Sequence, residues 1–154
     1  MYRQIRKQER KLNEAEISEI IKNSLYGVLS TSDNNNSPYG VPLTYVELNN
    51  NLYFHGATEG HKLDNIRLND KVSFCIVSQA ILAPERFNVK YKSVIVFGKA
   101  SEVFDDEKHD VLIALINKYS ALYVEKGETL IDKIGFRTRT IKMSMEHITG
   151  KVGG

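Results

Sequence analysis

The 154-residue sequence contains one cysteine, no tryptophan and no long apolar run. The single Cys75 can form neither an internal disulfide nor a cysteine-based zinc site. We therefore expect Cys75 to be a small core residue and the protein to reside in a reducing compartment. No segment approaches the ~20 consecutive apolar residues that a membrane-spanning helix needs. The charged N-terminal segment is followed by no apolar stretch of the kind found in secretory signals. We therefore expect a cytoplasmic protein with no membrane partner and no bound metal.

The sequence also has little net charge, because 21 Lys and Arg against 19 Asp and Glu give +2. Nucleic-acid binding needs clustered cations, so we expect no nucleic-acid partner. Residues 3–11 are basic and allow two interpretations: a contact to nucleic acid or membrane or, as we favour, a solvated lead-in to a helix. With 42% hydrophobic residues, the composition is that of an ordinary globular protein. The length predicts one domain, 1–154, with residues 1–12 as an N-terminal arm.

Several motifs of catalytic folds are missing. The sequence contains no G-x-S-x-G turn, no G-x-G-x-x-G after a first strand and no H-E-x-x-H motif. These absences argue against a hydrolase that uses the G-x-S-x-G turn, against a Rossmann fold and against a zinc enzyme.

Hydrophobic spacing predicts three helices, over residues 13–24, 58–69 and 105–127. Asn13 and Glu16 form the pattern of a capping box, in which side-chain and backbone groups bond reciprocally. The expected N-caps of the other two helices are Thr58 and either Asp105 or Asp106. Gly127 is expected to end the third helix, because glycine is common just after a helix terminus.

The remaining apolar segments have the alternation and turn composition of β-strands. Six strands are predicted, over residues 26–32, 39–48, 52–55, 71–79, 91–103 and 136–148. Residues 80–90 contain Pro84 and are expected to form a loop. Antiparallel strands that close on themselves remove their exposed edges. The sequence therefore predicts a mainly β protein, an antiparallel six-stranded β-barrel with peripheral α-helices.

One turn has the composition of a phosphate-binding site. In Gly56-Ala-Thr-Glu-Gly-His-Lys62, two glycines let backbone N–H groups approach an anion, and Lys62 supplies a positive charge. The N-terminus of the predicted helix at this turn adds a favourable partial charge. The spacing differs from that of a Walker A loop. A second interpretation stays open, because glycine-rich turns with one lysine are common between strands and helices.

Pro42 lies inside the predicted strand 39–48. Proline cannot donate a backbone hydrogen bond to a neighbouring strand, so it marks an edge or a break in a sheet. Free backbone groups beside it can bind a planar heterocycle that carries imide and carbonyl groups.

Four segments together resemble a known family. They are Gly40–Tyr45, Leu52–Lys62, Tyr91–Ala100 and Glu146–Lys151. In order and spacing they are similar to the FMN-binding split barrels of the pyridoxamine 5'-phosphate oxidase superfamily, and more closely to its short nitroimidazole-reductase (NimA-like) branch. The resemblance extends from about residue 26 to residue 151 and implies an FMN-binding split β-barrel.

The resemblance also implies a cofactor site. The strand segment that lies along the flavin corresponds to Val41, Pro42, Leu43, Thr44 and Tyr45, and the turn that holds the phosphate to His55, Gly56, Ala57, Gly60, His61 and Lys62. Lys62 is the implied main phosphate cation, while His61 stands where the oxidases carry arginine and is a weaker, pH-sensitive substitute. Ser93 matches a polar residue that reaches the flavin from the partner subunit, since these proteins are homodimers with two FMN sites at the interface.

The implied activity is that of an FMN-dependent reductase, with NADH or NADPH as reductant and small nitroaromatic or nitroimidazole compounds as acceptors. The alternative is a protein that binds flavin, haem or deazaflavin without turnover. Vitamin B6 oxidation is not expected, because the oxidases carry a C-terminal Trp and Arg segment that this sequence lacks. His55 is placed near the flavin, where it either acts in catalysis or serves as a hydrogen-bonded strand histidine.

Overall fold

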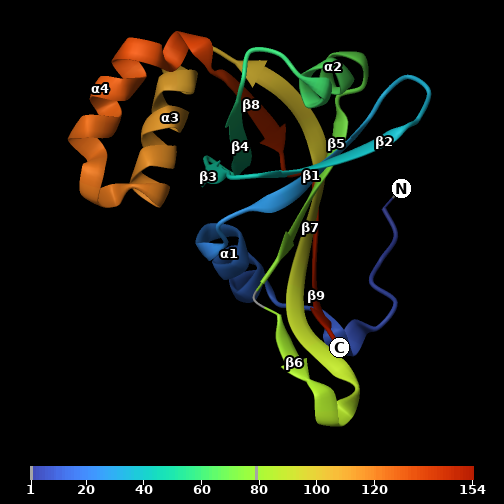
Figure 1. Cartoon of the computed structure of the whole chain (residues 1–154). Helices are drawn as coiled ribbons and strands as arrows, with labels where there is room; N and C mark the ends of the chain where they lie inside the picture. Colours follow the sequence, from blue (N-terminus) through green and yellow to red (C-terminus); the bar gives the residue numbers. More distant parts are fainter. Residues whose placement is uncertain (1, 79) are drawn as a thin grey trace.

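The structure is a computed structural model that describes residues 2–78 and 80–154. Within these residues the chain forms nine strands and four α-helices (Figure 1). The strands are β1 (Gly27–Ser32), β2 (Pro38–Leu43), β3 (Val46–Leu48), β4 (Asn51–Gly56), β5 (Lys71–Val77), β6 (Ile81–Ala83), β7 (Asn88–Val103), β8 (Arg139–Ser144) and β9 (His147–Gly153). The α-helices are α1 (Glu14–Asn23), α2 (His61–Leu68), α3 (Asp105–Tyr119) and α4 (Val124–Ile134). The strand pairs are antiparallel, which confirms the predicted class, mainly β with peripheral helices.

The hydrogen-bonded strands form a barrel that the chain itself closes. Their order is β2-β1-β5-β7-β8-β4-β3, and β6 and β9 pair with β7 outside this path. β2 and β3 stand at the two ends of the order, yet only Thr44 and Tyr45 separate them along the chain. Because consecutive Cα atoms lie ~3.8 Å apart, the ends of β2 and β3 are within about 11 Å, so the sheet must curl until its ends meet. We call residues Thr44 and Tyr45 the β2–β3 break.

The long strand β7 joins the parts of the barrel. Its first residues pair with β6, its middle with both β5 and β9, and its last residues with β8. In Figure 1 it curves along the height of the barrel. β7 begins at Asn88, before the predicted strand 91–103, because β6 pairs with its start.

Alternate strand residues fill the barrel interior. In β5, Val72, Phe74 and Ile76 are buried, as their spacing predicts. The Phe74 ring packs against Phe54 of β4 and Tyr45 of the β2–β3 break, with centroid distances of 4.9 and 5.0 Å. Each fully buried aromatic side chain contributes about 1.5–3 kcal/mol. This cluster therefore holds together strands from both ends of the sheet.

The predicted capping box at the start of α1 is confirmed. The Asn13 side chain accepts a hydrogen bond from the Glu16 N–H at 2.9 Å, and the Glu16 carboxylate accepts one from the Asn13 N–H at 3.1 Å. These two bonds pair backbone donors that the first helical turn leaves free.

The predicted N-caps of the next two helices are wrong. Gly60 rather than Thr58 precedes α2, because the chain turns there through a φ of 143°, which favours glycine. Phe104 precedes α3, since Asp105 and Asp106 already belong to the first helical turn.

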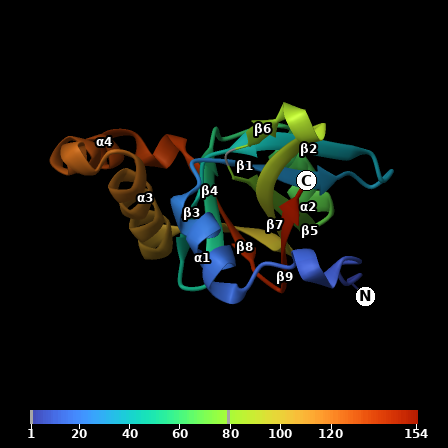
Figure 2. The same ribbon diagram turned by 90° about the horizontal axis from the view of Figure 1, so that it is seen from below.

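The predicted end of the third helix at Gly127 is also wrong. Gly127 lies inside α4, where a Cβ atom would come within 2.6 Å of Ile116 of α3. Glycine at this position therefore serves close packing of α3 against α4, and the chain leaves the helix earlier, at Ser120. The two helices form a hairpin beside the barrel (Figures 1 and 2). Among the helices that the structure describes, none is long and apolar enough to cross a membrane.

Three predicted segments contain more strands than expected, so the described chain has nine strands rather than six. Strand 39–48 is divided into β2 and β3, and strand 136–148 into β8 and β9. Segment 80–90, expected to be a loop, contains β6 and a 3-10 helix, Pro84–Arg86. At both of the first two divisions the apolar alternation shifts by one residue, at Tyr45–Val46 and between Met145 and Ile148, a sign that the six-strand prediction did not use. Gln79, in the predicted strand 71–79, and Met1 lie outside the described residues.

We expect Gly98→Ala to destabilise the protein by about 3 kcal/mol or more, because the new Cβ would lie 1.7 Å from the Ser144 carbonyl oxygen. Urea unfolding measures the loss. Gly40→Ala is the matched control, since a Cβ there meets only a Val28 methyl at 3.4 Å. Equal stability of the two variants would contradict the close approach of β7 to the β8–β9 turn.

Candidate functional site

The Tyr119 hydroxyl of α3 bonds the backbone at the β2–β3 break. It accepts a hydrogen bond from the Tyr45 N–H at 3.0 Å, and its single proton faces two carbonyl acceptors, Leu25 at 2.7 Å and Tyr45 at 2.9 Å. The Tyr45 ring is buried, and its hydroxyl donates to the Ile21 carbonyl. Burial, and next the neighbouring Tyr119, raise the pKa of Tyr45. The phenol of Tyr45 therefore stays protonated and acts as a donor.

The segment expected to lie along a flavin runs from β2 into this break. β2 ends the strand order, so Pro42 lies in an edge strand, as predicted. The side chains of Val41 and Leu43 pack toward the core, whereas Pro42 and Thr44 are exposed. With Tyr45 buried, a ligand on this segment would meet mainly backbone groups.

The turn between β4 and α2 brings a cation to a helix N-terminus. A Cβ on Gly56 would lie 3.0 Å from Lys62 Nζ, so the ammonium group lies close over Gly56. Gly60 is the N-cap, and the first N–H groups of a helix point out of its end. His61, the first residue of α2, stacks on Tyr39 of β2 with ring centroids 4.3 Å apart. The structure therefore brings together the predicted Gly56, Gly60, His61 and Lys62.

His55 lies next to this turn and faces the β2–β3 break. It lines the same pocket as Thr44. Partial burial, and next the positive charge of Lys62, lower the pKa of His55. The ring is therefore uncharged at neutral pH, with one hydrogen-bond donor and one acceptor. Ala57 follows β4 and is exposed.

Two side-chain amides hold α2 on β1. The Asn65 amide donates to the Thr31 hydroxyl at 2.9 Å, and both residues are buried. The Asn69 amide donates to the Ser32 hydroxyl, also at 2.9 Å. These bonds fix the direction in which the N-terminus of α2 points.

An apolar pocket of about 460 Å³ opens beside the β2–β3 break, and we call it the helix-hairpin pocket. Thr44 and His55 line its barrel side, and α3 and α4 line the other side. The aliphatic residues of the pocket are Leu112, Leu115 and Ile116 of α3 and Leu130, Ile131 and Ile134 of α4. The volume lies within the ordinary range of small-molecule sites.

The sequence did not reveal this side of the site. It predicted one helix over 105–127 and therefore placed no second helix near His55. Tyr119 lies on the predicted apolar face of that helix, but spacing gives no sign that its hydroxyl bonds the β2–β3 break. Asn65 had no signal either, since burial of a polar residue cannot be read from a short helix.

Within one chain, Ser93 lies away from the β2–β3 break and the β4–α2 turn. It lies on β7 opposite Val77, and β5 and β1 separate β7 from β2. Strand alternation places its side chain on the outside of the sheet, on what we call the outer sheet face. The residues of this face are Val28, Cys75, Val77, Ser93 and Ile95. Cys75, expected in the core, is therefore half-buried on the outside of the barrel.

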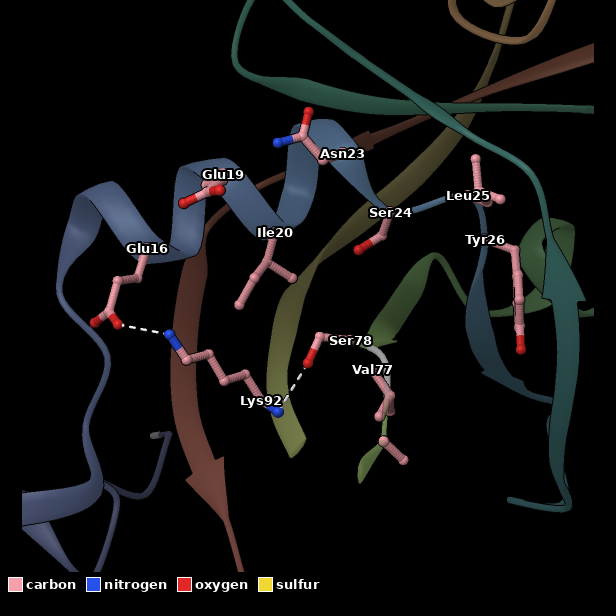
Figure 3. Close-up of a pocket in the computed structure, with 11 residues that line it drawn as sticks. Glu16, Glu19, Ile20, Asn23, Ser24, Leu25, Tyr26, Val77, Ser78 and Lys92 are labelled. Carbon is pink, nitrogen blue, oxygen red and sulfur yellow. Dashed lines mark hydrogen bonds and ion pairs between the residues drawn. The ribbon is translucent and has the colours of Figure 1, made fainter. Parts of the chain in front are cut away.

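A larger hollow of about 780 Å³ lies under α1 (Figure 3). Lys92 Nζ donates to the Glu16 carboxylate at 2.8 Å, and the Lys92 backbone N–H donates to the Ser78 hydroxyl at 2.9 Å. The bond from Lys92 is the main cause that lowers the pKa of Glu16. The Lys92 and Glu16 charges thus satisfy each other, and none of the predicted site residues lines this hollow. We therefore place the candidate site at the β4–α2 turn and the helix-hairpin pocket.

Lys118 of α3 is half-buried against the β2–β3 break, and its Nζ atom is itself buried. Its Nζ atom lies 3.8 Å from the centroid of the Tyr45 ring and has no hydrogen-bond partner among the described residues. Burial lowers the pKa of Lys118 to about 8. The face of the Tyr45 ring provides a weak favourable contact for the charged form.

The free energy of unfolding should therefore rise between pH 8 and pH 10.5 as Lys118 loses its proton. In this interval the unfolded chain, with a normal lysine pKa, binds more protons than the folded chain, so stability increases with pH. Urea unfolding across the interval should show a steeper rise for the wild type than for Lys118→Met. Lys22→Met, at an exposed position of α1, serves as control. The same slope in wild type and Lys118→Met would contradict the burial of this amine.

The family comparison covers nearly the whole chain. A sequence profile of the family described as pyridoxamine 5'-phosphate oxidase matches residues 13–152. Among curated proteins, none matches the chain significantly.

Three solved structures illustrate the fold. A candidate 5-nitroimidazole antibiotic resistance protein from Bacteroides thetaiotaomicron is 22% identical, with 91% of this chain and 84% of that chain covered at a TM-score of 0.72. A conserved hypothetical protein from Mycobacterium tuberculosis is 17% identical, with 96% and 89% covered at 0.81. The FAD and heme binding protein from Mycobacterium smegmatis is 14% identical, with 95% and 74% covered at 0.80. At these identities the likeness shows the fold, and it confirms the predicted split-barrel class.

Proposed function

Because the chain belongs to the pyridoxamine 5'-phosphate oxidase family, we propose that it binds FMN and acts as an FMN-dependent reductase of small acceptors, with NADH or NADPH as reductant. The observation that carries the proposal is the turn in which Lys62 rests on Gly56 at the N-terminal end of α2. This cationic turn adjoins His55 and the apolar helix-hairpin pocket. One site thus offers a place for an anionic group beside a place for an organic acceptor.

The residues of the turn fit a phosphate group. Lys62 supplies a formal charge, and the start of α2 supplies backbone N–H groups and a favourable partial charge. We assign the phosphate to His55, Gly56, Ala57, Gly60, His61 and Lys62. The flavin ring and ribityl chain are assigned to the backbone of the segment Val41, Pro42, Leu43, Thr44 and Tyr45. The exposed edge of β2 suits this role, because it leaves backbone groups free.

The proposed reaction is the two-electron reduction of a nitro compound. Bound FMN supplies the transfer of electrons from nicotinamide to acceptor. In balance, Ar–NO2, NADH and H⁺ give Ar–NO, NAD⁺ and H2O, so one N–O bond breaks and its oxygen leaves as water. The uncharged ring of His55 can donate one hydrogen bond to an acceptor oxygen in the helix-hairpin pocket. The name of the Bacteroides thetaiotaomicron structure, which refers to 5-nitroimidazole resistance, supports nitro compounds as the first acceptors to test.

A second candidate function is binding of flavin, haem or deazaflavin without turnover. It is favoured by the Mycobacterium smegmatis structure, which is described as binding FAD and heme. Anaerobic addition of NADH or NADPH to the purified protein separates the two candidates. Loss of flavin absorbance supports the reductase, whereas an unchanged flavin spectrum or a haem Soret band supports the binding protein.

Lys62→Ala should purify with little or no FMN, because the formal charge at the phosphate is lost. The measurement is the ratio of released FMN to protein after heat denaturation. Lys22→Ala, at an exposed position of α1, should retain the wild-type ratio. Full occupancy in Lys62→Ala would remove the phosphate assignment.

We also propose a homodimer that packs through the outer sheet face. Val28 and Val77 on this face are 38% and 52% exposed, an apolar area that a second copy would cover. Ser93 lies on the same face and away from the β4–α2 turn of its own chain. A dimer is the arrangement in which Ser93 of the partner subunit can reach the FMN.

Val77→Glu should convert the dimer to a monomer and lower its FMN content, because it places a charge in the packed face. Size-exclusion chromatography with light scattering gives the mass. Leu122→Glu is the control, since Leu122 is 92% exposed and lies outside the outer sheet face. A wild type that is monomeric with full FMN occupancy would contradict the dimer.

A further inference from the structure

The α3 and α4 side of the helix-hairpin pocket is mainly aliphatic. Six aliphatic side chains of α3 and α4 line it, and Leu112 and Leu115 among them are only 9% and 6% exposed. None of its lining residues, all within the described chain, is Asp, Glu, Lys or Arg. An ionised ligand entering such a pocket would lose its hydration without gaining a partner of opposite charge.

The polar lining residues of the pocket are Thr44, His55 and Thr138 on its barrel side, and Tyr119 and Ser120 at the end of α3. Thr44 and His55 also belong to the proposed FMN site, and Tyr119 already uses its hydroxyl at the β2–β3 break. A ligand can therefore make one or two hydrogen bonds at the barrel side while its body meets mainly aliphatic surface. This division selects an orientation as well as a class of ligand.

The α4 side of the pocket still has apolar surface to cover. Leu130 and Ile134 line the pocket while they are 54% and 42% exposed. α4 contributes no fully buried residue and packs on α3 at the close contact of Gly127 with Ile116. Covering apolar area is worth about 25 cal/mol per Å², so an apolar occupant of the pocket is stabilised by this wall.

We infer that the helix-hairpin pocket binds uncharged, mainly apolar aromatic molecules, with the polar or reducible group toward His55 and Thr44, and that it rejects their ionised analogues. As a statement about acceptors, the inference rests on the proposed reductase function. As a statement about binding, it stands on the residues of the pocket alone.

The test compares 4-nitrotoluene with 4-nitrobenzoate on the FMN-loaded protein, because the two probes differ in one substituent and its charge. Equilibrium dialysis at neutral pH gives both dissociation constants. We expect 4-nitrotoluene to bind about tenfold more tightly or better, since the carboxylate would be desolvated without a partner. Equal or tighter binding of 4-nitrobenzoate would overturn the inference.

A pair of leucine variants locates the binding. Leu130→Asp places a charge in the pocket wall and should weaken 4-nitrotoluene binding about tenfold or more, with unchanged FMN content. Leu122→Asp makes the same change at a residue that does not line the pocket and should bind as the wild type does. Ile134→Asp is a second test in the same wall. Wild-type binding in both Leu130→Asp and Ile134→Asp would place the ligand elsewhere and refute the assignment.

Turnover is measured separately with both probes and with NADH and NADPH. Selective binding that Leu130→Asp removes, without any nicotinamide-dependent reduction, supports the pocket and contradicts the reductase. Reduction of both probes at the same kcat/KM, unaffected by Leu130→Asp, keeps the reductase and contradicts the pocket.

Discussion

The hydrogen bonds of the Tyr119 hydroxyl to the Tyr45 backbone are the constraint on which the rest of the structure depends. At the β2–β3 break the two ends of the sheet are joined by the chain but by no ladder of hydrogen bonds. The Tyr45 N–H and C=O therefore need other partners, and a buried N–H left unpaired costs about 1–3 kcal/mol. Tyr119 meets both groups, at 3.0 and 2.9 Å, from the last turn of α3. The same contact thus completes the barrel and holds the helix hairpin against it.

The position of the candidate site follows from this contact. With the end of α3 fixed at the β2–β3 break, the aliphatic residues of α3 and α4 lie over Thr44 and His55, and the pocket forms between them. On the other side, the bond between Asn65 and Thr31 fixes α2 on β1 and so directs the cationic turn. β4 lies between the two, and its last residues, His55 and Gly56, each belong to one part of the site. Side chains that hold α2 and α3 on the barrel therefore set the geometry of the site.

The sequence predicted the local features of this arrangement better than the contacts between its parts. The capping box at Asn13 and the buried face of β5 are short-range patterns, and both are confirmed. The turn from Gly56 to Lys62 was predicted for its composition, and the structure does bring its glycines, histidine and lysine together. Gly127 was misread, because a glycine that allows close helix packing looks in sequence like one that ends a helix. The pocket could not be predicted, since it depends on a second helix and on a tyrosine hydroxyl that meets a strand 74 positions away in the chain.

Lys62 provides the positive charge near the end of β4, and it influences both the β4–α2 turn and His55 in the helix-hairpin pocket. Its ammonium group marks the proposed anion end, and the same positive charge is the second cause that lowers the pKa of His55. An anion bound at Lys62 would offset this second cause but leave burial, the larger one, in place. The pKa of His55 would then move back toward its usual value. Occupation of the anion end therefore makes the His55 ring more basic and easier to protonate, while the aliphatic walls beyond it continue to exclude charge. The end of β4 can thus hold an anionic cofactor and a neutral acceptor side by side. Lys62 provides the positive charge for the anion, and the aliphatic walls of the helix-hairpin pocket provide the uncharged surroundings for the acceptor.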